Sequence, residues 1–360
     1  MASAGVVSVA LRLMGARQMQ QAAAAASGAL QGVGRAGAAA TKELQAAQGA
    51  MMATARAGAM MTAAGAGMGY AMARAAKTSG EFAKIMAIVG KTSKSTTEDL
   101  EKQRDAAMRA GIDTQFSPTE AAKGMQVMAQ AGISARGQVQ MLIPVLDLAA
   151  AGQISVAEAA STTNRVLSIY GKTTADAAQV NDLMLGTTTM LDIGMQDMAN
   201  AIGKTAGKTK QLGQTFETTL LMLGLGNAAL GDINLASTAN SSALTRMMTN
   251  EKAKQNLDKL GIKTSNKKTN TNRQVVDIIL DLDAALEGVA VTEADRIRVE
   301  TLGARGMGAY QAVVAATATV VKNGKEETLR GADAIRVMRE RQKELIGMTA
   351  GFREALKQTY

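Results

Sequence analysis

The sequence contains no cysteine, histidine or tryptophan, and its 360 residues include only two prolines, four tyrosines and four phenylalanines. Without cysteine there is no disulfide. Without cysteine or histidine there is no zinc site of the usual ligands, no cysteine nucleophile and no imidazole base. Only carboxylate, lysine, tyrosine and hydroxyl groups remain for chemistry, so the composition disfavours an enzyme.

Small and flexible apolar residues take the place of the missing aromatics. The chain is rich in Ala, has 36 Gly and 24 Met, and is 47% hydrophobic. Ala has the best helix propensity, Met fills irregular gaps, and Pro, the main interior helix breaker, is scarce. We therefore predict an all-α protein of short consecutive helices. Apart from Val6–Leu13, no segment has the alternation typical of a strand.

The positive charge is concentrated near the N-terminus. Residues 1–80 carry seven cations and one acid, a net charge of +6, out of +9 for the whole chain. Within this basic, low-complexity segment, residues 57–73 are uncharged but rich in Gly, and they barely reach the length of a membrane span. We expect a basic N-terminal helical segment (1–80), with membrane contact through residues 49–76 as an open alternative, a helical core (81–321) and a charged C-terminal helix (322–360).

Helix start and stop signals alternate about every twenty residues after Glu81. Ser117-Pro118-Thr119-Glu120 and Ser155-Val156-Ala157-Glu158 are capping boxes, and Thr173 with Asp176 resembles a third. Gly132, Gly152 and Gly171 are predicted to end helices. A helix is predicted over Thr218–Gly231, which is apolar on all sides and so buried. Further helices are predicted over Leu235–Met248, Lys252–Leu260 and Val275–Leu286, from a cap at Thr292 with Asp295 three residues on, and over Glu326–Gln358 after a turn at Asn323-Gly324.

Two glycine patterns resemble phosphate-binding loops but lack their defining positions. The triplet Gly-Lys-Thr occurs at residues 90–92, 171–173, 203–205 and 207–209, and in no case does Gly stand five residues before the glycine. We interpret these triplets as helix ends followed by Thr caps. Gly32-x-Gly34-x-x-Gly37 follows an Ala run instead of a strand, and no acid follows at the required distance. No cofactor site is predicted.

Acidic side chains are the remaining candidates for catalysis or metal binding. Asp277 and Asp281 lie one turn apart on one helix face, with Asp283 nearby, which would allow a metal site or an acid/base pair. That face lies opposite the apolar stripe of Val275, Ile279 and Leu286, so a solvated surface is the simpler interpretation. We predict no catalytic, cofactor-binding or metal-binding residue, and a muramidase using Asp277 and Asp281 is kept only as an alternative.

Several segments, in the same order, resemble the core region of phage tail tape-measure proteins. The first is Ala110–Gly132, which contains Phe116-Ser117-Pro118-Thr119-Glu120. The others are Leu146–Gly152, Gly224–Asn227 followed by Ala239–Met248, Leu260–Thr264 and Glu300–Gly306. The resemblance covers about residues 81–321 and rests on the shared order of these segments.

This resemblance implies a structural protein in the lumen of a phage tail, made in the host cytoplasm, that sets tail length and leaves ahead of the DNA. It implies as partners a tail tube protein, tail assembly chaperones and baseplate or tail-tip hub proteins, and a homo-oligomer inside the tube. A membrane channel for DNA is the alternative. Specific nucleic-acid binding is not expected, because dense cation clusters and stacking aromatics are missing.

Overall fold

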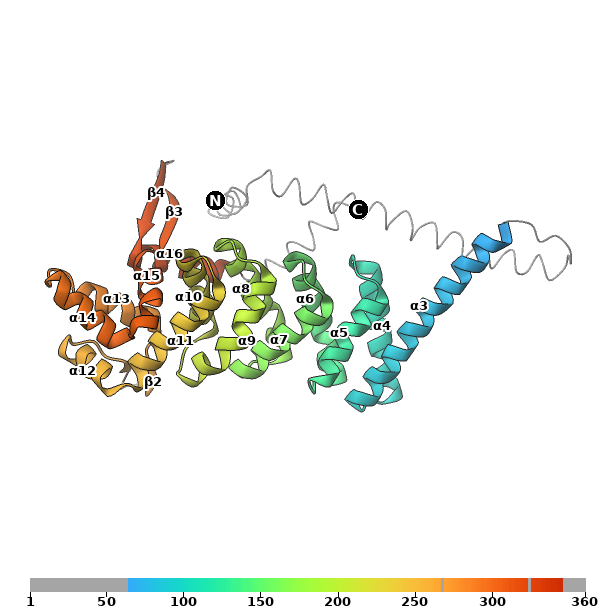
Figure 1. Ribbon diagram of the computed structural model, residues 1–360. Coiled ribbons are helices and arrows are strands. Elements are labelled where there is room, and N and C mark those ends of the chain that lie inside the picture. Colours follow the sequence, from blue (N-terminus) through green and yellow to red (C-terminus); the bar gives the residue numbers. More distant parts are fainter. Residues whose placement is uncertain (1–63, 267–268, 323–324, 346–360) are drawn as a thin grey trace, which may run out of the picture. The chain divides into compact units, whose positions relative to one another are not determined.

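The computed structural model describes residues 64–266, 269–322 and 325–345. Contacts within the chain divide it into two compact units, with the division after Arg136, and each unit is described by itself. Fourteen α-helices and two short antiparallel hairpins make up the described part (Figure 1). The predicted all-α class is therefore confirmed for these residues. Residues 1–63, including Val6–Leu13 and the glycine pattern at 32–37, lie outside them.

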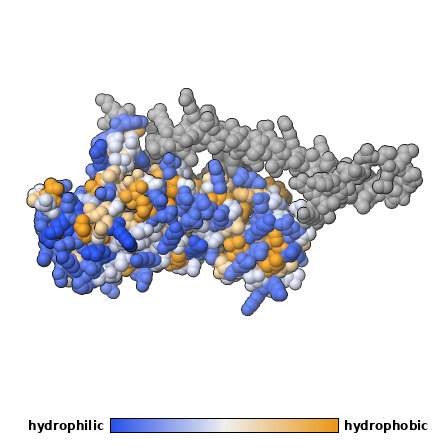
Figure 2. All heavy atoms as spheres, in the orientation of Figure 1, coloured by the Kyte–Doolittle hydropathy of each residue, from blue (hydrophilic) through white to orange (hydrophobic). Residues whose placement is uncertain are grey.

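The described part of the first unit contains three helices. They are α3 (Ala64–Ser93), α4 (Thr97–Asp113) and α5 (Pro118–Gln130), and both α3 and α4 pack on α5. Their interface buries mainly Ala and Met side chains, among them Met86, Ala107, Ala110, Ala121, Ala122, Met125 and Met128, with Ile85 and Val89 as branched members. Figure 2 shows apolar side chains on the visible face of this unit. Met108 and Ile112 on α4 are exposed large apolar residues.

The second unit begins within the first turn of α6 and contains eleven helices. The helices are α6 (Ala135–Gly152), α7 (Val156–Tyr170), α8 (Ala177–Met190), α9 (Met195–Gln211), α10 (Phe216–Leu230), α11 (Ile233–Thr249), α12 (Glu251–Lys259), α13 (Val275–Ala285), α14 (Val291–Leu302), α15 (Met307–Val314) and α16 (Gly331–Glu344). From α7 to α11 each helix contacts the next one and the one after it. The result is a serial array of helices, side by side in chain order (Figure 1).

Helix α10 lies at the centre of this unit, as its apolar sequence predicts. Residues 218–226 are all buried, and α10 packs against α8, α9, α11, α13 and α15. Gly226 allows α11 to approach closely, because a Cβ at this position would lie 2.6 Å from the Cβ of Ala236. A larger residue would push the two helices apart.

The helices are joined by one recurring connector. A residue with φ between +50° and +83° ends the helix, and the N–H of the next residue donates to the carbonyl five positions earlier, over 2.8–3.1 Å. This is the Schellman arrangement, which satisfies carbonyls left free at a helix end. The left-handed position is occupied by Lys94, Gly132, Gln153, Gly171, Asp192, Gly213 and Gly261. In most cases the next helix begins within three residues.

Local signals predicted most helix boundaries correctly. The capping boxes Ser117–Glu120 and Ser155–Glu158 are both formed, with each serine accepting from the glutamate N–H and each glutamate accepting from the serine N–H. Thr173 and Asp176 cap a short 3₁₀ turn (Thr174–Asp176) that leads into α8. The cap assigned to Thr292 is wrong, because α14 begins at Val291 and Thr292 lies inside it.

A β-hairpin replaces the start of the predicted C-terminal helix. Strands β3 (Thr317–Lys322) and β4 (Lys325–Arg330) pair from Thr317↔Arg330 to Lys322↔Lys325, and the hairpin projects from the helices of this unit (Figure 1). Helix α16 therefore starts at Gly331, and not at residue 326. Asn-Gly between two strands is a strong hairpin signal, and the Thr/Val-rich stretch before it was overlooked. A shorter hairpin, β1 (Ser265–Asn266) with β2 (Thr271–Asn272), lies between α12 and α13.

Candidate interaction site

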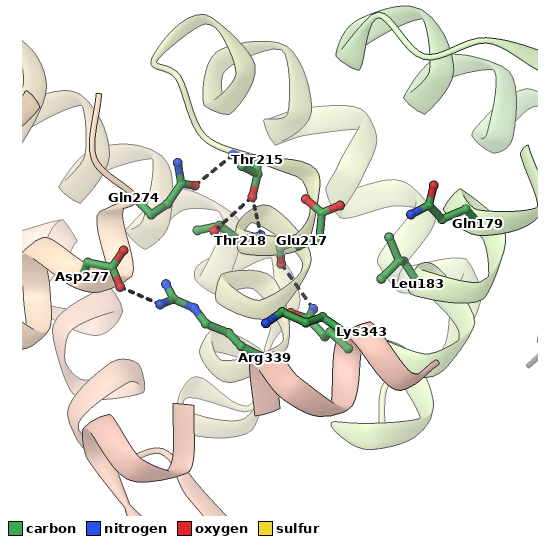
Figure 3. A pocket seen from close by; sticks show the side chains of 10 residues that line it. Gln179, Leu183, Thr215, Glu217, Thr218, Gln274, Asp277, Arg339 and Lys343 are labelled. Atoms are coloured by element: carbon green, nitrogen blue, oxygen red, sulfur yellow. Dashed lines mark hydrogen bonds and ion pairs between the residues drawn. The ribbon is translucent and has the colours of Figure 1, made fainter. Parts of the chain in front are cut away.

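A polar cleft of about 330 Å³ opens among α8, α10, α13 and α16 (Figure 3). All of its walls belong to the second unit. The lining residues are Gln179 and Leu183 on α8, Thr215, Glu217 and Thr218 at the start of α10, Gln274 and Asp277 at the start of α13, and Arg339, Gln342 and Lys343 on α16. The cleft therefore lies where the C-terminal helix returns to the middle of the helix array.

Hydrogen bonds across this cleft hold its walls together. The buried amide of Gln342 donates to Thr187 Oγ1 on α8 at 3.2 Å and to the Glu217 carbonyl on α10 at 3.3 Å. Gln274 accepts from the Thr215 N–H at 3.0 Å and donates to the Gly213 carbonyl at 3.2 Å (Figure 3). Most polar groups of the lining are thus occupied by one another. These hydrogen bonds connect helices that are far apart in sequence.

The sequence analysis did not single out Gln342, although a signal for it was present. Ile335, Met338 and Gln342 follow one another at helical spacing, and all three are buried. A polar residue in an apolar stripe has to find partners in the core, since an unsatisfied buried amide is costly. Its partners Thr187 and Glu217 precede it by more than a hundred residues, so the sequence could not identify them.

Each of the three aspartates on α13 is bonded to a different segment. Asp277 forms an ion pair with Arg339 on α16 at 2.6 Å, and Asp281 forms one with Arg273 at 2.7 Å. Asp283 accepts from the Tyr310 hydroxyl, and together with burial this raises the pKa of Tyr310 to about 12. The interpretation as a simple solvated face is wrong for Asp277 and Asp283, which are half-buried. Within the described residues, no group of three acidic side chains is placed to hold a metal ion.

Glu300 on α14 accepts hydrogen bonds from side chains of three helices. Its carboxylate accepts from Lys252 at 2.9 Å and Asn256 at 3.2 Å on α12, and from Arg296 at 3.0 Å, while its carbonyl accepts from Arg246 on α11. The bonds from Lys252 and Asn256, with the nearby cations, lower the pKa of Glu300 to about 2. This cluster fixes α12 against α14.

A buried hydroxyl cluster joins α7, α9 and α10. The Tyr170 hydroxyl donates to Thr219 Oγ1 at 2.9 Å and lies 3.1 Å from Thr209 Oγ1. Burial raises the pKa of Tyr170. The ring centroids of Phe216 and Tyr170 lie 5.1 Å apart, and Lys210 Nζ lies 5.9 Å from the centroid of the Tyr170 ring. One phenol and one phenyl ring thus anchor three helices here.

The interpretation of the Gly-Lys-Thr triplets is confirmed for one and wrong for three. Gly171 is a left-handed helix end followed by the Thr173 cap, as predicted. Residues 90–92 lie inside α3, and residues 203–205 and 207–209 lie inside α9. The spacing of four puts Gly203 and Gly207 on the exposed face of α9 and turns Thr205 and Thr209 inward. Helical backbone N–H groups are already bonded, so none of the three forms a phosphate loop.

The described residues include no single helix that is long and apolar enough to cross a membrane. Helices α6 and α7 pass the same test of length and composition only as a pair, bent by 116° at their connector. Most of the segment proposed for membrane contact, residues 49–63 of 49–76, lies outside the described residues, and residues 64–76 are part of α3.

Comparison with known proteins places this array in a family. Residues 104–303, more than half of the chain, match the family described as phage-related minor tail protein. The chain belongs to this family. The matched minor tail region runs from α4 to the end of α14, so it includes the α8, α10 and α13 walls of the cleft and leaves out α16.

Two curated relatives agree with this minor tail assignment and with the resemblance seen in the sequence. The tape measure protein of Pneumococcus phage Dp-1 is 27% identical over 251 residues, which are 69% of this chain and 21% of that protein. The probable tape measure protein of Escherichia phage P2 is 27% identical over 213 residues, 58% of this chain and 26% of that protein. The alignments thus span about a fifth to a quarter of these relatives. No solved structure matches the chain.

Proposed function

We propose that this chain is part of a tail tape measure, which lies in the lumen of a phage tail and sets the tail's length during assembly. The observation that carries the proposal is the match to tape measure proteins over two thirds of the chain. We further propose that it leaves the tail ahead of the DNA at ejection. Its partners would be the tail tube protein, tail assembly chaperones in the host cytoplasm, the baseplate or tail-tip hub, and further copies of itself.

The architecture is compatible with a structural role of this kind. Helices that pack through Ala, Gly and Met are slender, and the helices from α7 to α11 contact one another in series along the chain, with α10 and α11 also packing against helices between α13 and α15. The carboxylates of Asp277 and Asp281, the pair considered for catalysis, form ion pairs with Arg339 and Arg273 respectively. Both carboxylates therefore serve to hold neighbouring segments together. We therefore propose a structural protein without a reaction of its own.

The test is an in-frame deletion in the phage that removes one pair of helices. Deleting residues 172–213 joins Gly171 to Gln214, so that one left-handed connector replaces another. About forty residues of extended helix correspond to about 60 Å, and we expect tails shorter by up to this length in electron micrographs. A length-preserving variant in the same region, Gln153→Gly, serves as the control. Normal assembly at unchanged length would refute the measuring role.

A further inference from the structure

A second cleft, of about 470 Å³, lies among α7, α9 and the first turn of α11. Helix α9 contributes Asp197, Asn200, Gly203 and Lys204, whose spacing puts them on one face. The remaining lining residues are Arg165 on α7, and Ile233 and Asn234 on α11. The buried side chain of Ile233 gives this cleft an apolar wall.

The polar groups of this cleft are largely unoccupied, unlike those beside α16. Within the described part of the chain, the side chains of Arg165, Asp197 and Asn200 form no hydrogen bond or ion pair. Lys204 Nζ donates to a neutral group, Asn234 Oδ1, at 2.5 Å. The cleft therefore presents two cations that have no carboxylate bonded to them.

A nearby acid, Asp232, is already occupied as the cap of α11. Its carboxylate accepts from the N–H groups of Leu235 and Asn234, which are the main causes of its lowered pKa, and Lys204 adds the smallest contribution. Asp232 therefore interacts mainly with the N–H groups of α11 and only weakly with Lys204.

Gly203 leaves room for the Arg165 guanidinium beside α9. A Cβ at residue 203 would overlap Arg165 Nη1, so the guanidinium lies directly over the backbone of α9 at this glycine. Gly207, one turn later on the same exposed face, has nothing within 4 Å of the corresponding position. Arg165 and Lys204 thus both line this cleft, and the absence of a side chain at residue 203 leaves room for the guanidinium there.

We propose that this cleft binds an acidic segment of a protein partner. One carboxylate of the segment lies between Arg165 and Lys204, where two cations can donate charge-assisted hydrogen bonds. The Asp197 carboxylate and the side-chain carbonyl of Asn200 accept hydrogen bonds from backbone N–H groups of the same segment. A peptide offers both a carboxylate and N–H donors, whereas a nucleic-acid backbone offers only acceptors and would be repelled by Asp197.

The test measures binding of a short, labelled oligoglutamate peptide to the full chain by fluorescence anisotropy at low salt. We expect saturable binding that is about tenfold weaker in Arg165→Gln and in Lys204→Gln. Gly203→Ala should weaken it similarly, because it displaces the guanidinium without changing the charge. Two matched variants of the same helix, Lys208→Gln and Gly207→Ala, should bind as the unaltered chain does.

Three outcomes would overturn the proposal. The first is the absence of saturable peptide binding. The second is an equal loss in Lys208→Gln and Lys204→Gln, which would indicate general attraction to a basic surface. The third is tighter binding of a short DNA duplex than of the peptide under the same conditions. Thermal unfolding of every variant separates lost binding from lost folding. Because tail length plays no part in this assay, its result is independent of the tape-measure proposal.

Discussion

Substituting Ala for Gly should have opposite effects on stability at two exposed positions of the second unit. Gly171 has φ +65° at a helix end, and Gly207 lies within α9, and at both positions the space around an added Cβ is open. Crowding therefore cannot distinguish them. Only the backbone conformation differs, so the pair isolates the energetic cost of the left-handed connector.

The expected magnitudes follow from the backbone alone. At Gly171, Ala must adopt the left-handed region, which costs about 1–2 kcal/mol for an L-residue, while the stiffer unfolded chain returns about 0.4–1 kcal/mol. The net result is a loss of about 1 kcal/mol in the free energy of unfolding. At Gly207, Ala replaces Gly in an exposed helix, which stabilises by up to about 1 kcal/mol. A third variant reverses the first: Gln153, at φ +53°, should gain stability as Gln153→Gly.

The assay is urea unfolding of the full chain followed by circular dichroism at helical wavelengths, with all variants measured beside the unaltered protein. Because the chain has two units, hydrogen exchange near each site should accompany it, so that local and global effects are separated. Equal effects of Gly171→Ala and Gly207→Ala would refute the reasoning. A loss of stability in Gln153→Gly would refute it as well.

Three further predictions concern the polar contacts of the second unit. Tyr170→Phe should cost about 1 kcal/mol in chemical unfolding, because it removes the hydroxyl that bonds Thr219 while the ring stays packed; a change near zero would contradict this. Glu300 has a folded pKa of about 2, below its ordinary value of 4.5, so its contribution to stability is present above pH 4.5 and is lost as pH falls through 2; Glu300→Gln should flatten this part of the stability profile, and an unchanged profile would contradict the assignment. Gln342→Ala should increase hydrogen exchange in α16 well before α10 is affected, since it removes both bonds to α8 and α10; uniform exchange across the unit would show that α16 is not held there.

The sequence predicted the parts of the fold that depend on neighbours along the chain. Ser117 with Glu120, Ser155 with Glu158 and Gly171 act within a single turn, so their pattern alone determines a helix end. The buried character of α10 was predictable for a similar reason, since fourteen consecutive residues between Thr218 and Gly231 offer no polar face.

The errors arose where distant residues decide. Gly203 and Gly207 have the composition of helix ends, yet α9 continues through them because Thr205 and Thr209 are buried on its inner face. The acidic face of α13 was expected to meet solvent, and Asp277 instead meets Arg339 from a helix sixty residues later. The polar clefts could not be predicted at all, because their walls come from helices that only the packing of the unit brings together.

The serial contacts between α7 and α11 also bear on how this unit acquires its structure. The connectors close over a few residues, and most contacts of α7, α8 and α9 are with helices one or two places away in the chain, so these helices have short loops to close and are expected to form early and rapidly, whereas α10 and α11 also pack against helices as late as α15. The contact of Gln342 with Thr187 spans 155 residues and costs far more chain entropy. Among the described helices of this unit, α16 is then expected to dock last during synthesis, and the helices before it can already be ordered while the ribosome is still making it.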